Sequence, residues 1–284
     1  MRLRALLFAP GDSERKAAKA LESAADGVIL DLEDSVAPAG KGAARALVAG
    51  MLPGLAREGV VVRINPRGTE WYLADLAAVV PGRPRAVMLP KCGGAEDLRA
   101  LDHHLEALEM AYGLPVGEIG VLPIVTETAA SVLGLAGMVG APRVLALCFG
   151  AEDLSADLGI SPRLADGAYP AAVGQARAAV LLAAAAAGVP ALDTPWPDPR
   201  DPAGLAREAA AAAADGFSGK LCIHPVQLAA VQVAFTPDPV RVSWAVRVRD
   251  GFAGGEAGVF TLDGRMIDRP HLKLALRILA AAGH

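Results

Sequence analysis

The chain has 284 residues, and 53% of them are hydrophobic, which is enough for one sizeable core. Its net charge is −4, from 27 basic and 31 acidic residues without a basic block, so a nucleic-acid surface, which needs clustered lysine and arginine, is not expected. A membrane-spanning segment is not expected either, because the longest uncharged apolar stretch, 178–189, is shorter than the roughly 18 residues that cross a bilayer.

Eight short apolar runs have the pattern of buried strands, and each ends in a polar or ionisable residue. Segments long enough for a helix separate the runs, so predicted strands and helices alternate along the chain. The predicted strands are 6–9, 28–32, 60–64, 86–89, 121–125, 144–149, 189–192 and 221–223. The predicted helices are 13–23, 43–57, 71–79, 95–111, 129–138, 164–187, 203–214 and 225–234.

This alternation predicts an α/β fold, a closed (β/α)8 TIM barrel. In such a barrel all strands open at their carboxyl ends on one face, where the active site lies. The polar residues at the strand ends, scattered in sequence, are then expected to converge there. A doubly wound open sheet is the alternative, but no glycine-rich dinucleotide fingerprint follows the first strand.

The last part of the chain breaks the alternation. The pattern predicts a helix over 240–252, a hairpin over 259–267 around an Asp-Gly turn, and a final helix over 270–282. We therefore expect a barrel domain over residues 1–236. The remainder, residues 237–284, is expected to be a C-terminal extension of the same structural unit that serves as a lid or an oligomer contact.

The cysteines and the N-terminus bear on the cellular compartment. Cys92, Cys148 and Cys222 show neither metal nor disulfide spacing, so buried free thiols are predicted. The chain starts with a short apolar run that lacks a signal-peptide pattern. We expect a cytoplasmic protein without membrane or nucleic-acid partners.

Two acids follow consecutive predicted strands. Glu127 and Asp153 are 26 residues apart and are expected to converge at the barrel mouth. Mg²⁺ takes one or two carboxylates, keeps waters and completes its shell with substrate oxygens, so the pair fits this ion. The alternative is that each acid caps the helix that follows it.

A charged group is predicted around the second and third strands. Arg63 lies within an apolar strand, where its guanidinium must be satisfied by carboxylates or by a ligand. It is expected either to stabilise an oxyanion or to form an ion pair with Glu33 or Asp34. Asp31 and Glu33 share one face by strand alternation and are candidate partners for Arg63 and Lys91, or groups that orient the metal ligands.

Two further cation patterns leave alternatives open. Arg15 and Lys19 lie one turn apart on the first predicted helix, and a helix N-terminus with flanking cations can bind an anion, although such side chains are usually solvated. Lys91 and Lys220 raise Schiff-base chemistry, against which the acid pair favours a metal. His224 ends the last strand and is a candidate ligand contact.

Seven motifs together resemble a known family. The chain is similar over residues 6–282 to the citrate lyase β-subunit family, which includes malyl-CoA and citramalyl-CoA lyases. Several motifs in the same order are far more specific than any one of them. In order they are Leu-Phe-Ala-Pro-Gly-Asp, Leu-Asp-Leu-Glu-Asp-Ser-Val, Val-Arg-Ile-Asn-Pro, Met-Leu-Pro-Lys, Glu-Thr-Ala, Phe-Gly-Ala-Glu-Asp-Leu and Cys-Ile-His-Pro-Val-Gln.

The resemblance implies a (β/α)8 barrel that forms homotrimers, with Mg²⁺ held by Glu127 and Asp153 and with Arg63 at the reacting end of the substrate. It also implies that Asp268, which the pattern alone predicts to be the N-cap of the final helix, reaches the active site of a neighbouring subunit as a catalytic acid. The implied CoA-binding edge consists of Phe8, Arg15, Lys19, His224 and Pro225. Supporting roles are expected for Asp31, Glu33, Asp34, Lys91 and Asp193.

The implied activity is Mg²⁺-dependent carbon–carbon cleavage. A 3-hydroxy-3-carboxy acyl thioester, such as a citryl, malyl or citramalyl group, would give an acetyl thioester and a 2-oxo acid. Arg63 would stabilise the enolate oxygen and Asp268 would protonate the enolate carbon. One alternative is an Mg²⁺-dependent aldolase that acts on free 2-oxo acids. Another is a citrate lyase β subunit that works only with a partner acyl carrier protein.

Overall fold

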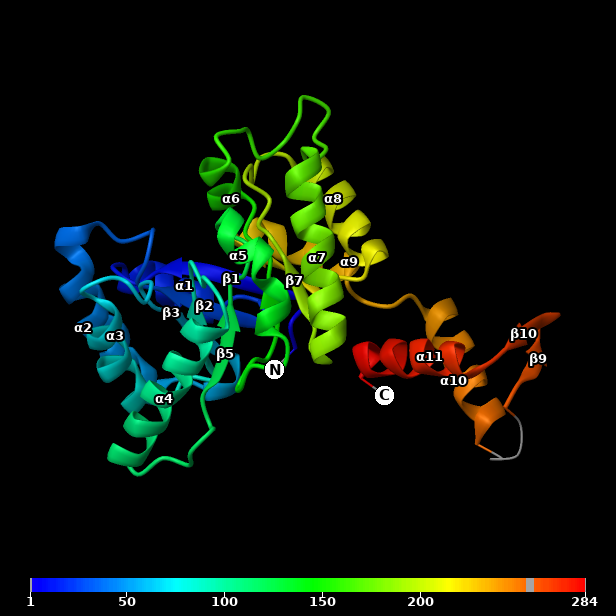
Figure 1. Cartoon of the computed structure of the whole chain (residues 1–284), viewed down its shortest axis with the longest axis horizontal. Helices are drawn as coiled ribbons and strands as arrows, with labels where there is room; N and C mark the ends of the chain where they lie inside the picture. The colour runs from blue at the N-terminus through cyan, green and yellow to red at the C-terminus, as the bar shows by residue number, and fades with distance from the viewer. Residues whose placement is uncertain (1, 254–257, 284) are drawn as a thin grey trace. The chain divides into compact units, whose positions relative to one another are not determined.

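The computed structural model describes residues 2–253 and 258–283 (Figure 1). The chain divides into two compact units, Met1–Val231 and Gln232–His284. The first unit carries all the parallel strands, and the second carries one antiparallel hairpin between two helices.

Strands and helices alternate in the first unit as the sequence predicts. The strands are β1 (Ala5–Pro10), β2 (Gly27–Asp31), β3 (Val60–Arg63), β4 (Ala86–Leu89), β5 (Gly120–Pro123), β6 (Leu147–Cys148), β7 (Ala191–Asp193) and β8 (Gly219–Cys222). The α-helices are α1 (Glu14–Leu21), α2 (Lys41–Met51), α3 (Tyr72–Val79), α4 (Ala95–Ala111), α5 (Ala129–Leu133), α6 (Glu152–Asp157), α7 (Ala171–Ala187), α8 (Pro202–Asp215) and α9 (Leu228–Ala234). Short 3₁₀ turns are η1 (Pro38–Gly40), η2 (Leu52–Gly54), η3 (Arg57–Gly59), η4 (Val80–Gly82), η5 (Leu135–Met138) and η6 (Pro225–Gln227).

The strands form one parallel sheet in the order β5-β4-β3-β2-β1-β8-β7-β6. Two isolated parallel bridges, Val121↔Val144 and Ile124↔Cys148, join the two ends of this order. The sheet is therefore a nearly closed barrel surrounded by helices, and the predicted (β/α)8 fold is confirmed over the open-sheet alternative (Figure 1).

Three predicted elements differ in extent. The strand predicted over 144–149 is reduced to Leu147–Cys148, and its neighbours are held by bridges and single hydrogen bonds. The helix predicted over 164–187 begins at Ala171, directly after Pro170, because proline suits the start of a helix and disrupts its interior. The helix predicted over 43–57 ends at Met51, where a 3₁₀ turn containing Pro53 follows.

Strand alternation decides which side chains face the barrel interior. Ile29, Val61, Met88 and Leu122 belong to one buried cluster inside the barrel. Asp31 and Arg63 lie two residues beyond Ile29 and Val61 on the same strands, so they continue the inward face at its carboxyl end. The polar strand ends on this face are thereby brought together.

The second unit has its own small core. Helices α10 (Pro239–Phe252) and α11 (Arg269–Ala282) bury Val248 and Leu279 between them. Strands β9 (Phe260–Leu262) and β10 (Arg265–Ile267) pair antiparallel across Asp263 and Gly264, whose φ angles are 49° and 74°. Both central turn residues have positive φ, as a type I′ turn requires, and the predicted hairpin is confirmed.

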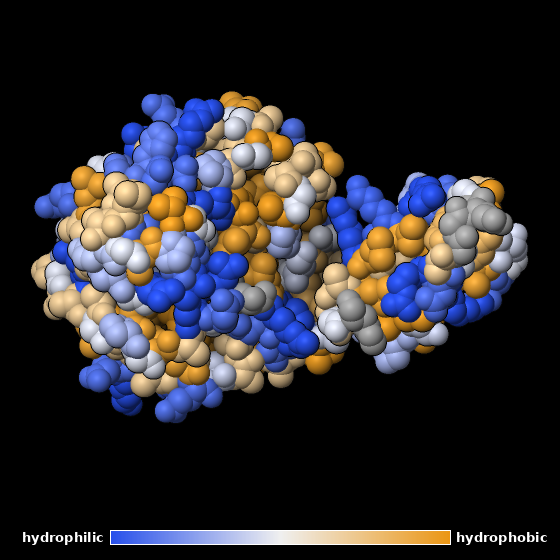
Figure 2. All heavy atoms as spheres, turned by 90° about the horizontal axis from the view of Figure 1, so that it is seen from below, coloured by the Kyte–Doolittle hydropathy of each residue, from blue (hydrophilic) through white to orange (hydrophobic). Residues whose placement is uncertain are grey.

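The surface mixes apolar and charged residues (Figure 2). Exposed large apolar side chains include Leu133 and Leu182 in the first unit and Val240 and Met266 in the second. Within the described ranges, no helix is both long and apolar enough to cross a lipid bilayer.

Candidate active site

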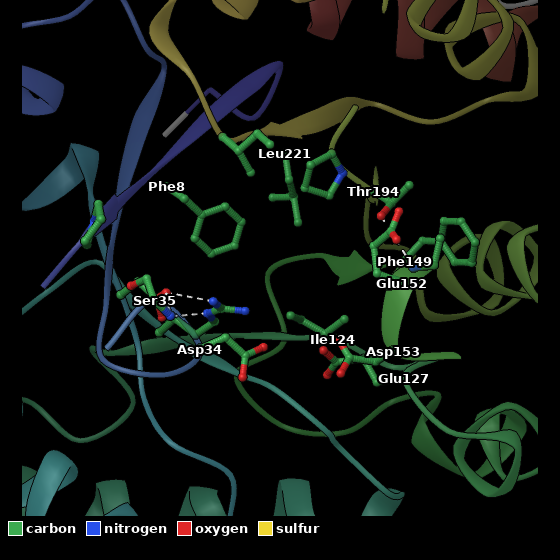
Figure 3. A pocket seen from close by; sticks show the side chains of 17 residues that line it. Phe8, Asp34, Ser35, Ile124, Glu127, Phe149, Glu152, Asp153, Thr194 and Leu221 are labelled. Atoms are coloured by element: carbon green, nitrogen blue, oxygen red, sulfur yellow. Dashed lines mark hydrogen bonds and ion pairs between the residues drawn. The ribbon is translucent and has the colours of Figure 1, made fainter. Parts of the chain in front are cut away.

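A cavity of about 340 Å³ opens at the carboxyl ends of the strands. In Figure 3 the side chains of Asp34, Glu127 and Asp153 project into it. The position agrees with the active-site face of a parallel barrel. The residues that line it are Phe8, Pro10, Asp31, Asp34, Ser35, Arg63, Ile124, Glu127, Phe149, Gly150, Ala151, Glu152, Asp153, Thr194, Pro195, Leu221 and Ile223.

Arg63 is held rigidly in this cavity. Its Nε and Nη2 atoms donate to the two carboxylate oxygens of Asp31, each at 2.7 Å, and Nη1 lies 3.0 Å from Glu33 Oε2. The guanidinium also lies over the Phe8 ring, 4.7 Å from its centroid. The two-pronged bond to Asp31 fixes the plane of the guanidinium, which a simple point-charge contact does not do.

The pKa values of this pair follow from their contact. Burial alone would raise the pKa of Asp31, but the hydrogen bonds and charge of Arg63 outweigh burial and hold that pKa below its usual value. Burial would lower the pKa of Arg63, but Asp31 outweighs it and raises that pKa further. Both groups are therefore ionised. Of the acids that the sequence offers as partners of Arg63, Asp31 is the principal one and Glu33 the second.

Glu127 and Asp153 lie on the opposite side of the cavity. Glu127 follows β5 and is buried, whereas Asp153 lies in the first turn of α6 with its side chain 40% exposed. Burial, with a further contribution from the charge of Asp153, raises the pKa of Glu127 to about 8. The capping alternative does not hold for Glu127, because Thr128 is the N-cap of α5.

Lys91 connects the two sides. Its backbone N–H donates to Glu127 Oε2, and its Nζ forms an ion pair with Glu33 and lies 3.6 Å from Asp34 and 3.8 Å from Asp153. The residue has a φ of 49°, a left-handed conformation that is uncommon outside glycine. This backbone turn brings both the amide and the side chain of Lys91 to the acidic residues.

The Schiff-base alternative is not supported by either lysine. Burial lowers the pKa of Lys91, but Glu33 and the other acids outweigh burial and raise it, so the amine stays protonated and is not nucleophilic. Lys220 is fully buried and donates to Asp193 at 2.9 Å and to Glu208 at 2.5 Å. Its amine is thus committed to an ion cluster that does not line the cavity.

Asp193 belongs to that same cluster. Its carboxylate contacts Lys220 and Arg177, the latter at 3.1 Å. Leu192 and Thr194, its neighbours on both sides, face the barrel core and the cavity respectively. By alternation Asp193 faces the surrounding helices, so the structure separates it from the other strand-end acids.

The residues of the predicted CoA edge are placed on two neighbouring strand ends. β1 pairs with β8, so α1 and the His224 segment follow adjacent strands. Phe8 lines the cavity, and Arg15 and Lys19 are exposed on α1, whose N-cap is Ser13. His224 is exposed and caps the η6 turn that begins at Pro225, with Nδ1 accepting from the Val226 N–H at 3.2 Å.

Asp268 belongs to the second unit and is the N-cap of α11, as the sequence pattern predicts. Its Oδ1 lies 2.5 Å from Nδ1 of His271, one turn into the helix. The side chain is 36% exposed, so the carboxylate can be reached from solvent.

Sequence reasoning missed a scaffold beneath the Asp31–Asp34 segment. Lys41 is buried, and its Nζ donates to the carbonyl oxygens of Leu32 and Glu33 at 2.8 and 2.7 Å. The side-chain amide of Asn65 donates to the same Leu32 oxygen at 3.0 Å. Asn65 ends the third strand and offered a signal, whereas Lys41 looks in sequence like an ordinary helix lysine.

The two acids fit a magnesium ion. Burial raises the pKa of Glu127, so a cation bound beside it would stabilise its charged form. No cluster of three or more His, Cys, Asp or Glu ligands occurs among the described residues, so a site built for a softer metal is not found in them. Mg²⁺ needs only one or two carboxylates and fills its other positions with water and substrate.

Comparisons with known proteins show the family of the chain. The family model described as HpcH/HpaI aldolase/citrate lyase matches residues 4–225. The chain is 40% identical over 278 residues to a citrate lyase subunit beta-like protein of Mycobacterium tuberculosis, covering 98% of this chain and 94% of that protein. It is 34% identical over 301 residues to the mitochondrial citramalyl-CoA lyase of Rattus norvegicus, covering 98% and 86%.

A solved structure extends the match to three dimensions. The crystal structure of the protein CitE from Mycobacterium tuberculosis, in complex with magnesium, acetoacetate and coenzyme A, has a TM-score of 0.80 and 38% identity. The match covers all of this chain and 99% of that one. The chain belongs to the HpcH/HpaI aldolase/citrate lyase family.

Proposed function

We propose that this protein is a Mg²⁺-dependent carbon–carbon lyase that cleaves, or forms, a 3-hydroxy-3-carboxy acyl-CoA. The products of cleavage are acetyl-CoA and a 2-oxo acid. The observation that carries the proposal is one cavity that holds a rigid arginine on one side and the carboxylates of Glu127 and Asp153 on the other. Relatives that are named as lyases, and one that is solved with magnesium and coenzyme A, support it.

Glu127 and Asp153 would hold the Mg²⁺. When bound, the ion supplies a Lewis acid that orients and polarises the hydroxyl and carboxylate groups of the substrate. The backbone N–H of Lys91 and the contact of its Nζ with Asp153 orient the two carboxylates. Lys91 would thus have a supporting role together with Glu33 and Asp34, which contact its amine.

Arg63 would stabilise the negative charge that develops on the thioester oxygen. Asp31 and Glu33 fix the guanidinium before the substrate arrives, so no reorganisation is needed during the reaction. Because two of its faces are occupied by carboxylates, the remaining side of the guanidinium faces the cavity that Phe8 and Ile124 also line.

Asp268 would transfer the proton at the carbon of the acetyl product. We propose that the protein is a homotrimer in which Asp268 of one subunit serves the cavity of its neighbour. The second unit would then act as a lid and an oligomer contact. The contact between Asp268 Oδ1 and His271 supports the role, because a hydrogen-bonded and partly exposed carboxylate can exchange a proton.

CoA would lie over the edge formed by α1 and the His224 segment. Arg15 and Lys19, both exposed, would supply positive charge for its phosphates, and Phe8, His224 and Pro225 would contact the rest of the carrier between there and the cavity. We place the protein in the cytoplasm, where its three buried and unpaired cysteines stay reduced.

An Mg²⁺-dependent aldolase acting on free oxo acids is the second candidate, because the acidic side of the cavity alone would suffice for it. A β subunit that depends on an acyl carrier protein is the third. The exposed cations on α1 favour a phosphate-bearing carrier over a free acid.

A substrate screen with purified protein tests the proposal. Acetyl-CoA and Mg²⁺ are supplied with glyoxylate, pyruvate or oxaloacetate, and free CoA and acyl-CoA products are measured by mass spectrometry. We expect Mg²⁺-dependent condensation with at least one oxo acid and none after EDTA treatment. Equal activity in excess chelator, or a lysine adduct trapped by borohydride, would overturn the mechanism. Aldol products formed without CoA would favour the second candidate.

A further inference from the structure

The acidic side of the cavity is built where the barrel is least regular. β6 has only two residues, and backbone pairing there is limited to a few hydrogen bonds. The Val125 N–H donates to Cys148 O at 3.0 Å, and the Phe149 N–H donates to Leu192 O at 2.9 Å. Past Phe149 the backbone N–H groups find no strand carbonyl as partner among these described hydrogen bonds, yet Asp153 lies only four residues further on.

After Phe149, two threonine hydroxyls replace strand carbonyl groups as hydrogen-bond acceptors for the backbone N–H groups. The Gly150 N–H donates to Thr126 Oγ1 at 3.0 Å, and the Ala151 N–H donates to Thr194 Oγ1 at 3.4 Å. The Thr126 hydroxyl in turn donates to Gly150 O at 3.3 Å. Both threonines are buried, so these bonds are shielded from water.

Gly150 lets Glu127 approach this segment closely. A Cβ atom at Gly150 would lie 2.8 Å from Glu127 Cγ and 2.9 Å from Ile124 Cγ2. The side-chain carbons of Glu127 therefore lie close to the backbone of Gly150, whose N–H donates to Thr126. Thr126 directly precedes Glu127, and Gly150 lies three residues before Asp153. The Thr126 side chain therefore links the backbone at Glu127 to the segment that leads to Asp153.

We infer that Thr126 and Thr194 are positioning residues that set the spacing between Glu127 and Asp153. Their hydroxyls lie beyond the ends of β5 and β7, accept from the Gly150 and Ala151 N–H groups, and fix the start of the segment that leads to Asp153. The inference rests on the proposed function, since it takes the two acids as the magnesium ligands. Loss of either hydroxyl leaves a buried N–H without its acceptor and frees the segment to move.

Titration calorimetry with Mg²⁺ alone tests this on the full-length protein. Thr126→Val keeps the shape of the side chain and removes the hydroxyl, and we expect it to weaken Mg²⁺ binding by about tenfold or more. Thr126→Ser keeps the hydroxyl and should bind within about twofold of the wild type. Thr194→Val removes a longer bond and should weaken binding by about threefold.

A remote threonine serves as the matched control. Thr69 donates through its hydroxyl to Pro66 O at 2.7 Å in the segment after β3, so Thr69→Val also deletes a threonine hydrogen bond. It should leave Mg²⁺ binding unchanged. Circular dichroism and thermal melting establish that each variant is folded, and if Thr126→Val does not fold, Thr194→Val and Thr126→Ser decide the question.

The outcomes separate this inference from the proposed function. Wild-type protein that binds no Mg²⁺, or an Asp153→Ala variant that binds it equally well, would refute the metal site itself. Wild-type binding that Asp153→Ala abolishes, together with wild-type affinity in folded Thr126→Val and Thr194→Val, would leave the metal site standing and overturn the positioning role.

Discussion

The two sides of the cavity differ in how their charges are satisfied. On the Arg63 side, Asp31 and Glu33 neutralise the guanidinium through contacts of 2.7–3.0 Å. On the Glu127 side, the shift of the pKa of Glu127 to about 8, caused first by burial and further by Asp153, marks an uncompensated acid. The charge of Asp31 is thus stabilised by its partner, whereas the charge of Glu127 is disfavoured in the absence of a bound cation.

This difference teaches which functional residues also support the fold. Removing a member of a satisfied buried ion pair leaves its partner charged and unpaired, which is strongly destabilising. Removing a carboxylate that is already uncompensated relieves a cost. Mutations on the two sides should therefore change stability in opposite directions while both reduce activity.

The largest effect is expected for Arg63→Ala. It leaves the ionised Asp31 without its cation and Glu33 with Lys91 alone, so the free energy of unfolding should fall by about 3–5 kcal/mol. Turnover should fall by about a hundredfold, with a much smaller change in KM, because the charge that we propose Arg63 stabilises develops only in the transition state. Chemical denaturation and steady-state kinetics below the melting temperature measure the two quantities.

Arg67→Ala is the matched control for this change. It removes an arginine whose ion pair with Asp97, at 2.8 Å, is largely exposed, and such pairs contribute at most about 1 kcal/mol. Near-wild-type turnover in Arg63→Ala would contradict the catalytic role, and unchanged stability would contradict the contrast between the two sides.

Glu127→Gln is expected to stabilise the metal-free protein while it abolishes Mg²⁺ binding. The pKa of Glu127 is about 8 in the folded chain and near the ordinary 4.5 when unfolded, because burial disfavours its charged form. As pH rises between these values the unfolded state loses a proton that the folded state keeps, so wild-type stability decreases. The gain from glutamine should thus grow across this window, to on the order of 5 kcal/mol above pH 8.

Denaturation curves at several pH values in EDTA measure this gain. Each kcal/mol corresponds to roughly 2–4 °C in melting temperature for a protein of this size class. A glutamine variant that is less stable than the wild type at pH 9 would show that Glu127 is compensated by the protein itself.

Magnesium binding by the wild type should depend on pH for the same reason. Mg²⁺ binds the ionised carboxylate, so below the pKa of Glu127, about 8, binding must displace a proton. The affinity should rise by about tenfold per pH unit up to that value and level off above it. Calorimetry in buffers of different ionisation enthalpy should count close to one proton released at pH 7, and none released would contradict the raised pKa.

The smallest effect is expected at the exposed CoA edge. Arg15→Ala with Lys19→Ala should raise KM for acetyl-CoA by a few-fold, leave turnover unchanged, and alter stability by less than about 0.5 kcal/mol, because both side chains are exposed. The difference from the wild type should shrink at high ionic strength. A matched pair of exposed cations elsewhere, Arg241 and Arg249 on α10, should show no effect on KM.

Much of this arrangement follows from alternation in the sequence. The βα alternation predicts the barrel, and the period of two predicts that Asp31 and Glu33 share a face. Asp31 and Arg63 even stand opposite each other in the register of β2 and β3. Glu127 and Asp153 follow consecutive strands, which is sufficient to bring them to one end of the barrel.

The remainder depends on contacts that a linear pattern does not contain. Asp193 ends its strand, as Asp31 does, but its position in the strand alternation places its side chain outside the barrel, where it contacts Arg177 and Lys220. Strand alternation from Met88 would direct the side chain of Lys91 away from the barrel interior. Its positive φ changes the direction of the backbone there and brings the side chain to the acidic residues of the cavity. The threonine bonds to Gly150 and Ala151 join segments 24 and 43 residues apart, so local sequence gives no sign of them.

The small number of hydrogen bonds between β5 and β6, where the barrel closes, has a consequence for local unfolding. Only a few bonds cross this seam, among them those from Val121 N–H to Arg143 O at 2.8 Å and from Leu145 N–H to Val121 O at 2.9 Å. Amide protons there should exchange with deuterium sooner than those between β1 and β2, whose pairing is continuous. Glu127 follows β5 and Asp153 follows β6, so a cation bound by both would hold the two strands together. Mg²⁺ should therefore slow exchange most at the amides between β5 and β6.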